Sequence, residues 1–253
     1  MLRRILWFAT AYTLVIIVHE TAHALTACAL GLETTLYHFW ANIDPGNRAT
    51  IAGRSAYGVA GPVASLLLGI AAWLTYRNRR IHGSAAAMPL LYLAALGISN
   101  CFGNLMSAAF IGDLSNVSNW LGLPGSARYA ISILGAIVLT AVMFVAGREL
   151  ARWTTPRASR ATAALTAVVL PVVIGTAMII VVNQPVPIAG FATARVGESA
   201  FWLFAAAGAF TAAPQSVQER ADLRLRWQDG AIAAFVVAAV RVMSLGIPLL
   251  RST

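Results

Sequence analysis

Five consecutive residues near the start of the chain combine side chains that could hold a metal ion and activate water. His19-Glu20-Thr21-Ala22-His23 follows the His-Glu-x-x-His pattern inside an apolar stretch that we expect to be helical. A spacing of four residues puts both imidazoles on one helix face, one turn apart, so both can reach a single zinc ion at about 2.0–2.1 Å. Glu20 lies beside them, and its carboxylate can take a proton from water and return it to a leaving amine. The pattern predicts the metal centre of a hydrolase.

The alternative is that the two histidines and the glutamate only form hydrogen bonds to neighbouring helices. Ionisable side chains inside a membrane helix cost on the order of 2.5–3.5 kcal/mol each on insertion scales. Three of them in one apolar segment therefore favour a metal site over a polar network.

A catalytic zinc ion needs a third protein ligand and an open position for water. Asp113 is the carboxylate that ends a later apolar run, whereas Glu33 and Asp44 lie in a polar connection and the remaining acidic residues lie in basic loops or at the edges of apolar runs. We therefore expect Asp113 to complete the site. The alternative for Asp113 is an ordinary turn aspartate at the membrane interface.

Composition places the chain among membrane proteins. Apolar residues make up 59% of the 253 residues, charged residues make up 11%, and the mean hydropathy is +0.74. A helix needs about 20 apolar residues to cross a bilayer. Seven runs are candidates, at 5–30, 56–76, 85–111, 129–147, 161–182, 199–213 and 231–250, of which the sixth is short for a crossing. The expected fold is an all-α integral membrane protein with about six or seven transmembrane helices.

All eighteen basic residues are arginine, and with nine acidic residues they give a net charge of +9. They gather in short clusters between apolar runs, as in proteins whose arginines fix their orientation in a lipid bilayer, so nucleic acid is not an expected partner. The clusters that fall on one side are Arg3 and Arg4; Arg77, Arg79 and Arg80; Arg148, Arg152, Arg157 and Arg160; and Arg220, Arg224 and Arg226. This bias predicts a cytoplasmic N-terminus.

The connection after the first apolar run predicts a β-hairpin. Residues 34–40 are rich in β-branched and aromatic side chains, and Asp44-Pro45-Gly46-Asn47 has strong turn chemistry. We expect the returning strand at 48–52, which gives a hairpin over residues 34–52. The hairpin could pair with an extended peptide through its edge, or it could be a surface loop anchored by its aromatic residues.

These elements, in this order, resemble the site-two protease family of intramembrane zinc metalloproteases. The resemblance covers about the first 115 residues. It is carried by His19 to His23, the hairpin, the segment Gly61-Pro62-Val63-Ala64-Ser65, and Asn104-Leu105 followed by Asp113. Family members usually have an asparagine where this chain has Ser65 and Asp-Gly where it has Gly112-Asp113-Leu114.

The resemblance implies that His19, His23 and Asp113 bind Zn²⁺, that Glu20 is the acid/base, and that Asn104 holds the substrate backbone near the metal. It also implies that the hairpin aligns the substrate as an extended strand. The substrates would be transmembrane segments of other proteins. Residues 1–115 would form the catalytic core, with its three transmembrane helices, and residues 116–253 would form accessory or gating helices.

We therefore expect a zinc metalloendopeptidase that crosses a bacterial cell membrane several times. The competing interpretation is a polytopic membrane protein without enzymatic activity: a transporter, an assembly factor or an inactive relative of the proteases. In such a protein the histidine and glutamate cluster would be structural or would bind an ion. Proteolysis that depends on Glu20 separates the two interpretations.

Overall fold

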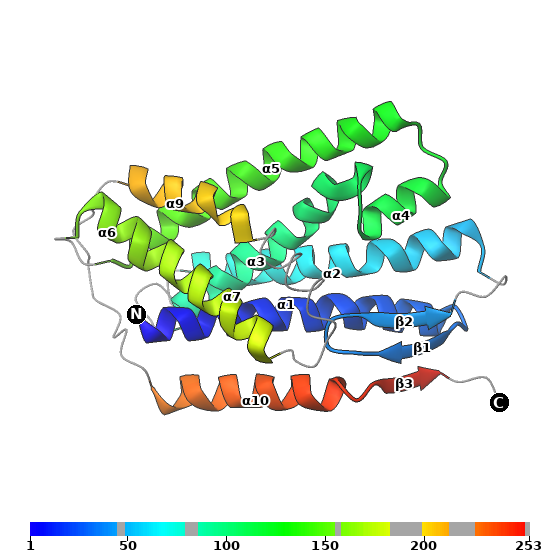
Figure 1. Cartoon of the computed structure of the whole chain (residues 1–253), viewed down its shortest axis with the longest axis horizontal. Coiled ribbons are helices and arrows are strands. Elements are labelled where there is room, and N and C mark those ends of the chain that lie inside the picture. Colours follow the sequence, from blue (N-terminus) through cyan, green and yellow to red (C-terminus); the bar gives the residue numbers. More distant parts are fainter. Residues whose placement is uncertain (45–48, 79–85, 155–157, 183–198, 213–225, 251–253) are drawn as a thin grey trace. The chain divides into compact units, whose positions relative to one another are not determined.

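The computed structural model describes residues 1–44, 49–78, 86–154, 158–182, 199–212 and 226–250 (Figure 1). Most of these residues are helical. The helices are α1 (Leu2–Ala29), α2 (Ile51–Arg77), α3 (Ala87–Met106), α4 (Asp113–Trp120), α5 (Gly125–Ala151), α6 (Arg160–Ala164), α7 (Leu170–Val182), α9 (Trp202–Thr211) and α10 (Trp227–Met243). A 3₁₀ turn, η2 (Ser107–Ala109), follows α3, and a π-helical turn, η3 (Leu165–Val169), joins α6 to α7. The strands are β1 (Glu33–Leu36), β2 (Ala41–Asp44) and β3 (Ile247–Leu250).

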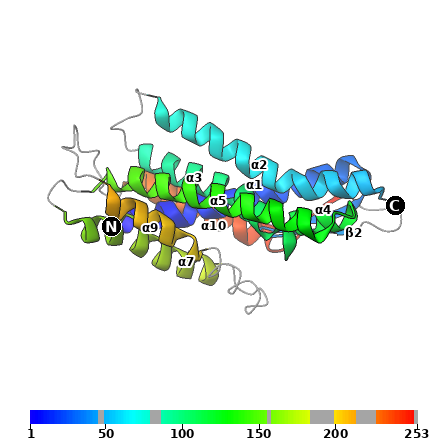
Figure 2. The same cartoon turned by 90° about the horizontal axis from the view of Figure 1, so that it is seen from above.

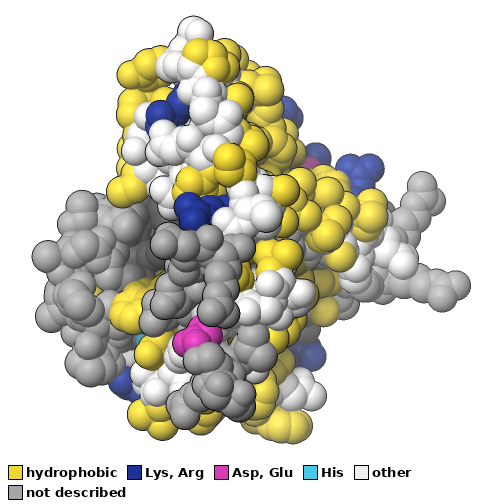
Figure 3. Space-filling view, turned by 90° about the vertical axis from the view of Figure 1, so that its right-hand side faces the viewer, with side chains coloured by type: hydrophobic (Ala, Val, Ile, Leu, Met, Phe, Trp, Pro, Cys, Tyr) yellow, Lys and Arg dark blue, Asp and Glu magenta, His cyan; other side chains and the backbone are white. Residues whose placement is uncertain are grey.

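Five helical segments are long and apolar enough to cross a membrane: α1, α2, Ala87–Ala109, α5 and Arg160–Val182. They coincide with the first five apolar runs of the sequence, which are confirmed as helices. Apolar side chains point outward from them, and Leu67, Leu74, Ile133 and Ile137 are all more than half exposed. Figure 3 shows hydrophobic side chains spread over the face that it views. These features are compatible with a multi-pass membrane protein.

The sixth and seventh apolar runs differ from the prediction. The sixth forms only the ten-residue helix α9, which is too short to cross as a straight helix, and its predicted end at 213 lies outside the described residues. In the seventh, α10 ends at Met243, Gly246 has a φ of 79°, and the chain continues as β3. Glycine adopts this left-handed conformation without steric cost, so it turns the chain out of the helix. The described residues thus contain five long spans rather than six or seven.

The predicted hairpin is present, but its boundaries were wrong. The strand expected at 34–40 ends at Leu36, and β2 returns at Ala41 with Leu36 opposite Ala41. The predicted turn at 44–47 begins at the end of β2, and residues 45–48 lie outside the described part of the chain. The predicted return strand at 48–52 is also wrong, because α2 begins at Ile51.

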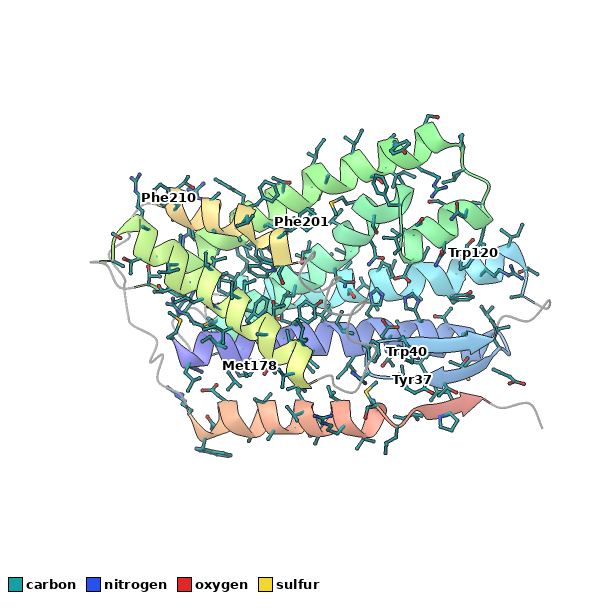
Figure 4. All side chains as sticks on the ribbon, in the orientation of Figure 1. Tyr37, Trp40, Trp120, Met178, Phe201 and Phe210 are labelled. Carbon is teal, nitrogen blue, oxygen red and sulfur yellow. The ribbon has the colours of Figure 1, made fainter. Side chains whose placement is uncertain are left out.

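Tilted and edge-on contacts between aromatic rings stabilise the early turn, which has none of the usual turn residues. Tyr37 N donates to Trp40 O at 2.8 Å, and the two rings lie 5.0 Å apart (Figure 4). The Phe39 ring lies 4.4 Å from those of both His38 and Trp40. An edge-to-face aromatic pair such as Phe39 and Trp40 contributes about 0.5–1.5 kcal/mol beyond its burial. Residues 37–40, whose aromatic side chains predict an extended strand, therefore form the turn between β1 and β2 instead.

Contacts divide the chain into two compact units. Unit 2 comprises 14–68, 97–139 and 238–253, and it contains the sheet, in the order β2-β1-β3 with both neighbours antiparallel to β1. The sheet packs on the second half of α1 and the end of α10 through a cluster formed by Ala24, Leu36 and Met243. Every residue of the predicted metal site falls in this unit.

Unit 1 comprises 1–13, 69–96 and 140–237. Phe8 lies at its centre, with the Tyr92 and Trp202 rings edge-on to it at 5.9 and 5.2 Å. Helix α9 lies against α5 (Figures 1 and 2), where Gly147 and Gly208 let the two backbones approach closely. At these two glycines the helices therefore pack backbone against backbone.

Two of the arginines used to predict the orientation are buried in unit 1. Arg3 is 4% exposed and forms a two-point ion pair with Asp229, at 2.9 and 3.1 Å. Arg4 is 6% exposed and donates to the carbonyls of Trp153 and Thr166. Because both guanidinium groups bind within the protein, they do not report on the side of the membrane. The cytoplasmic N-terminus stays a prediction.

Candidate metal centre

Helix α1 carries the two histidines of the site one turn apart on its inner face. His19 and His23 are 5% and 6% exposed, and their Nε2 atoms lie 3.0 Å from each other. The helical spacing predicted from the sequence therefore brings the two imidazoles together as expected.

Asp113 reaches the same point from a different part of unit 2. It is the first residue of α4 and follows Gly112, whose φ of 99° and ψ of −172° fall in a region essentially restricted to glycine. Its Oδ2 lies 3.0 Å from His19 Nε2 and 3.3 Å from His23 Nε2. Of the described residues, His19, His23 and Asp113 form the one group of three potential ligands whose donor atoms converge in this way.

The triangle of donor atoms matches three corners of a tetrahedral site. An ion with ligands at about 2.0–2.2 Å in tetrahedral geometry separates those ligands by roughly 3.3–3.6 Å. The observed separations of 3.0, 3.0 and 3.3 Å need outward shifts of only a few tenths of an ångström. Two imidazole nitrogens and one carboxylate suit zinc, and they also suit other first-row divalent metals. The group could hold a metal ion, and its geometry does not select zinc.

Helix α2 fixes the orientation of both imidazole rings. His23 Nδ1 makes a short hydrogen bond to the backbone carbonyl of Tyr57. Because a carbonyl can only accept, Nδ1 carries a proton, so in the neutral ring Nε2 has the lone pair that a metal ion needs. His19 Nδ1 lies 3.1 Å from Ser65 Oγ, which can accept the proton of that ring in the same way. Hydrogen bonds of this kind hold metal-binding histidines in the required tautomer.

Gly61 lies directly against the two histidines. A Cβ atom at this position would be 2.6 Å from His19 Nε2 and closer still to His23 Nε2. Any side chain here would compete for the space that the two ligand atoms face. The absence of a side chain at Gly61 therefore allows α2 to pass close to the site.

The charge environment favours ionised Asp113. Burial acts to raise the pKa of this carboxyl group, but hydrogen bonds and charge interactions with His19 and His23 outweigh burial and hold the pKa below its ordinary value. Asp113 is therefore an anion at neutral pH. An anionic ligand beside two imidazoles, which are neutral when they bind a metal ion, compensates part of the charge of a divalent ion.

The other two predicted site residues lie nearby without joining the triangle. Glu20 is half-buried on α1 and close enough for its charge to act on His23. Asn104 donates from its amide nitrogen to the carbonyl of Asn100. Its Oδ1 would lie 3.5 Å from a Cβ built on Gly112, so the amide flanks the residue that precedes Asp113.

Sequence reasoning missed the partners that orient the histidines. Ser65 stood out only as a departure from the family pattern, and nothing in the sequence identifies the Tyr57 carbonyl. Pro62 lacks the N–H that would bond the Gly58 carbonyl, so it marks a loosened turn of α2 one residue beyond Tyr57 without identifying the Tyr57 carbonyl.

Comparisons of the chain with models of known protein families, with characterised proteins and with solved structures find no match. The site must therefore be interpreted from its own geometry.

Proposed function

We propose that this protein is an intramembrane zinc metalloprotease of the site-two protease type. The observation that carries the proposal is the buried triangle of His19 Nε2, His23 Nε2 and Asp113 Oδ2, with sides of 3.0–3.3 Å. Two lone pairs and a carboxylate so close together repel one another unless a cation or a proton lies between them. A helix compatible with membrane insertion would not carry such a cluster without a compensating role.

Each residue then has a distinct task. His19, His23 and Asp113 would hold Zn²⁺, which when bound supplies a Lewis acid and lowers the pKa of water. Glu20 would accept a proton from the attacking water and deliver it to the nitrogen of the leaving amine. Its place on α1, next to a ligand but outside the triangle, suits a base that needs to reach water and not the ion.

The substrate backbone would be held by Asn104 and by the sheet. Asn104 Oδ1 could accept a hydrogen bond from a substrate N–H, since the amide nitrogen of the same side chain is already bound to Asn100 O. β1 is paired on both sides, so of the two hairpin strands it is β2 whose outer edge a substrate strand would extend. A substrate in this extended form exposes its peptide bonds, whereas a membrane helix satisfies its own.

We further propose a location in a bacterial cell membrane, with membrane proteins as substrates. Five long apolar helices supply the membrane anchor. The two histidines of the site lie on α1, which is long and apolar enough to cross a membrane. Cleaving a soluble protein would not require a site on such a helix, whereas a substrate in the bilayer would. The N-terminus would face the cytoplasm, on the arginines at the connections between the five long helices. Those on its side are Arg77, Arg79, Arg80, Arg148, Arg152, Arg157 and Arg160, against Arg48, Arg54 and Arg128 on the other side.

The test is cleavage of co-reconstituted single-span membrane proteins in vesicles by the wild type and by Glu20→Gln. The amide is nearly isosteric with the carboxylate but cannot accept the proton, so we expect zinc content to be kept and cleavage to fall by about 10²–10⁴-fold. Glu33→Gln, on the exposed end of β1, is the matched control and should cleave at the wild-type rate.

Equal cleavage by the wild type and Glu20→Gln would contradict the assignment of the base. A wild type that binds zinc but cleaves no membrane protein in a broad panel would favour the second candidate, a non-enzymatic membrane protein with an ion-binding site. That candidate rests on the same triangle of donor atoms. Three converging ligand atoms can hold an ion whether or not the site catalyses a reaction.

A further inference from the structure

The segment that carries Asp113 has little secondary structure of its own. It consists of the three-residue turn η2, the turn around Gly112, and the eight-residue helix α4. No side-chain cap closes the start of α4 at Gly112. An isolated helix of this length is unstable in water, so tertiary contacts must hold the segment in place.

Arg128, in the first turn of α5, makes four hydrogen bonds to this segment. Its Nε donates to Ala108 O at 3.4 Å, and its Nη2 donates to Ala109 O at 3.2 Å. On the other side of Gly112, Nη2 also reaches Ser115 Oγ at 3.3 Å, and Nη1 donates to Asn119 Oδ1 at 2.7 Å. One guanidinium group thus connects the end of η2 to α4, and the ligand lies on the chain between the two.

A second contact from α5 supports the first. Ser132, one turn after Arg128, accepts a hydrogen bond from Ala109 N at 3.0 Å. The opposite side of α4 packs on α2 at Gly58, where a Cβ would lie 2.6 Å from Val117 Cγ2 and 3.1 Å from the Trp120 ring. α4 is therefore held between a polar contact from α5 and a close apolar contact with α2.

We propose that Arg128 is a positioning residue for the metal centre: it fixes the turn at Gly112 so that the Asp113 carboxylate meets the two histidines. The planar guanidinium is suited to this task, because it donates in several fixed directions at once, whereas a lysine ammonium is a flexible point charge. The four hydrogen bonds of Arg128 go to residues on either side of Asp113 and not to its carboxylate, so its effect passes through the backbone of the segment. The inference rests on the metal site of the proposed function but not on proteolysis.

The test is Zn²⁺ affinity of the purified protein in detergent, measured by competition with a chromophoric chelator in a double-mutant cycle. Arg128→Gln should weaken Zn²⁺ binding by about 10–100-fold, the range found when groups that orient ligands are removed. The same substitution in an Asp113→Ala background should change the weaker residual affinity by less than about threefold, because the ligand that Arg128 positions is already absent. Arg148→Gln, exposed near the other end of α5, is the matched control and should bind Zn²⁺ like the wild type.

Arg128→Lys keeps the charge and guards against a failure of Arg128→Gln to fold. It should bind Zn²⁺ with an affinity between those of the wild type and Arg128→Gln, since an ammonium cannot reach all four acceptors. Wild-type affinity in Arg128→Gln, or an equal loss in both backgrounds, would overturn the positioning role while leaving the metal site intact. A wild type that binds no Zn²⁺ would overturn the proposed function as well.

Discussion

Gly61→Ala should weaken metal binding strongly without unfolding the protein. The new methyl group would lie 2.6 Å from His19 Nε2 and closer to His23 Nε2, whereas ordinary contacts begin at 3.4 Å. Both rings would have to move by about 1 Å or rotate away. They cannot do so freely, because His23 Nδ1 is bound to Tyr57 O and His19 Nδ1 faces Ser65 Oγ.

The expected loss follows from the tolerance of a metal site. Ligand distances must stay within about 0.2 Å of their ideal values, so a displacement several times larger removes one or both imidazoles from the ion. We expect Zn²⁺ affinity to fall by at least about 100-fold, or roughly 2.7 kcal/mol. The fold should survive, because alanine is favoured over glycine inside a helix by about 0.5–1 kcal/mol, which offsets part of the strain.

Zinc titration of purified Gly61→Ala against the wild type checks this prediction, with Gly103→Ala as the control. Gly103 is also helical, but a Cβ there meets no atom within 4 Å, so this variant should bind zinc normally. Thermal unfolding of both variants would show that the fold is retained. If Gly61→Ala binds zinc as tightly as Gly103→Ala, the ligand atoms do not lie where the structure puts them, and the reasoning fails.

Three further predictions concern the third ligand, an orienting hydroxyl group and a distant ion pair. Asp113→Ala and Asp113→Asn should both weaken Zn²⁺ binding strongly in a titration, whereas Glu33→Gln should not. Ser65→Ala should weaken it by about 10–100-fold, because the His19 ring loses its hydrogen-bond partner. Asp229→Asn should lower stability by about 3–5 kcal/mol at neutral pH, because it removes the carboxylate charge that pairs with the buried Arg3. Burial acts to raise the pKa of Asp229, but hydrogen bonds, including that from Arg3, hold it below its ordinary value. The stabilisation is therefore present above about pH 4 and is lost below it, so the difference in Tm between Asp229→Asn and the wild type should shrink as the pH falls.

The parts of the site that sequence predicts are those set by local periodicity or by chemical necessity. His19 and His23 meet because four residues make one helical turn. Asp113 is predictable because a metal site needs a third ligand and few carboxylates are available, and its Oδ2 lies 3.0 Å from His19 Nε2 in the structure. The first five long helices follow from apolar runs that exceed the length of a membrane crossing.

The parts that sequence does not predict depend on contacts between distant segments. The closeness of Gly61 to the histidines, and the contacts of Arg128 with the segment around Asp113, arise from helix packing that leaves no local pattern. β3 follows α10 within a single apolar run, and hydropathy does not distinguish a strand from a helix there. Its pairing with β1 joins residues more than two hundred positions apart.

X-ray absorption at the zinc edge of the purified protein tests the central claim, that His19, His23 and Asp113 together hold a zinc ion. The expected result is one zinc per chain with two imidazole nitrogens and oxygen ligands at about 2.0–2.2 Å, and loss of this spectrum in Asp113→Ala. A protein that carries no zinc, or a spectrum with sulfur at about 2.3 Å from Cys28 or Cys101, would contradict it.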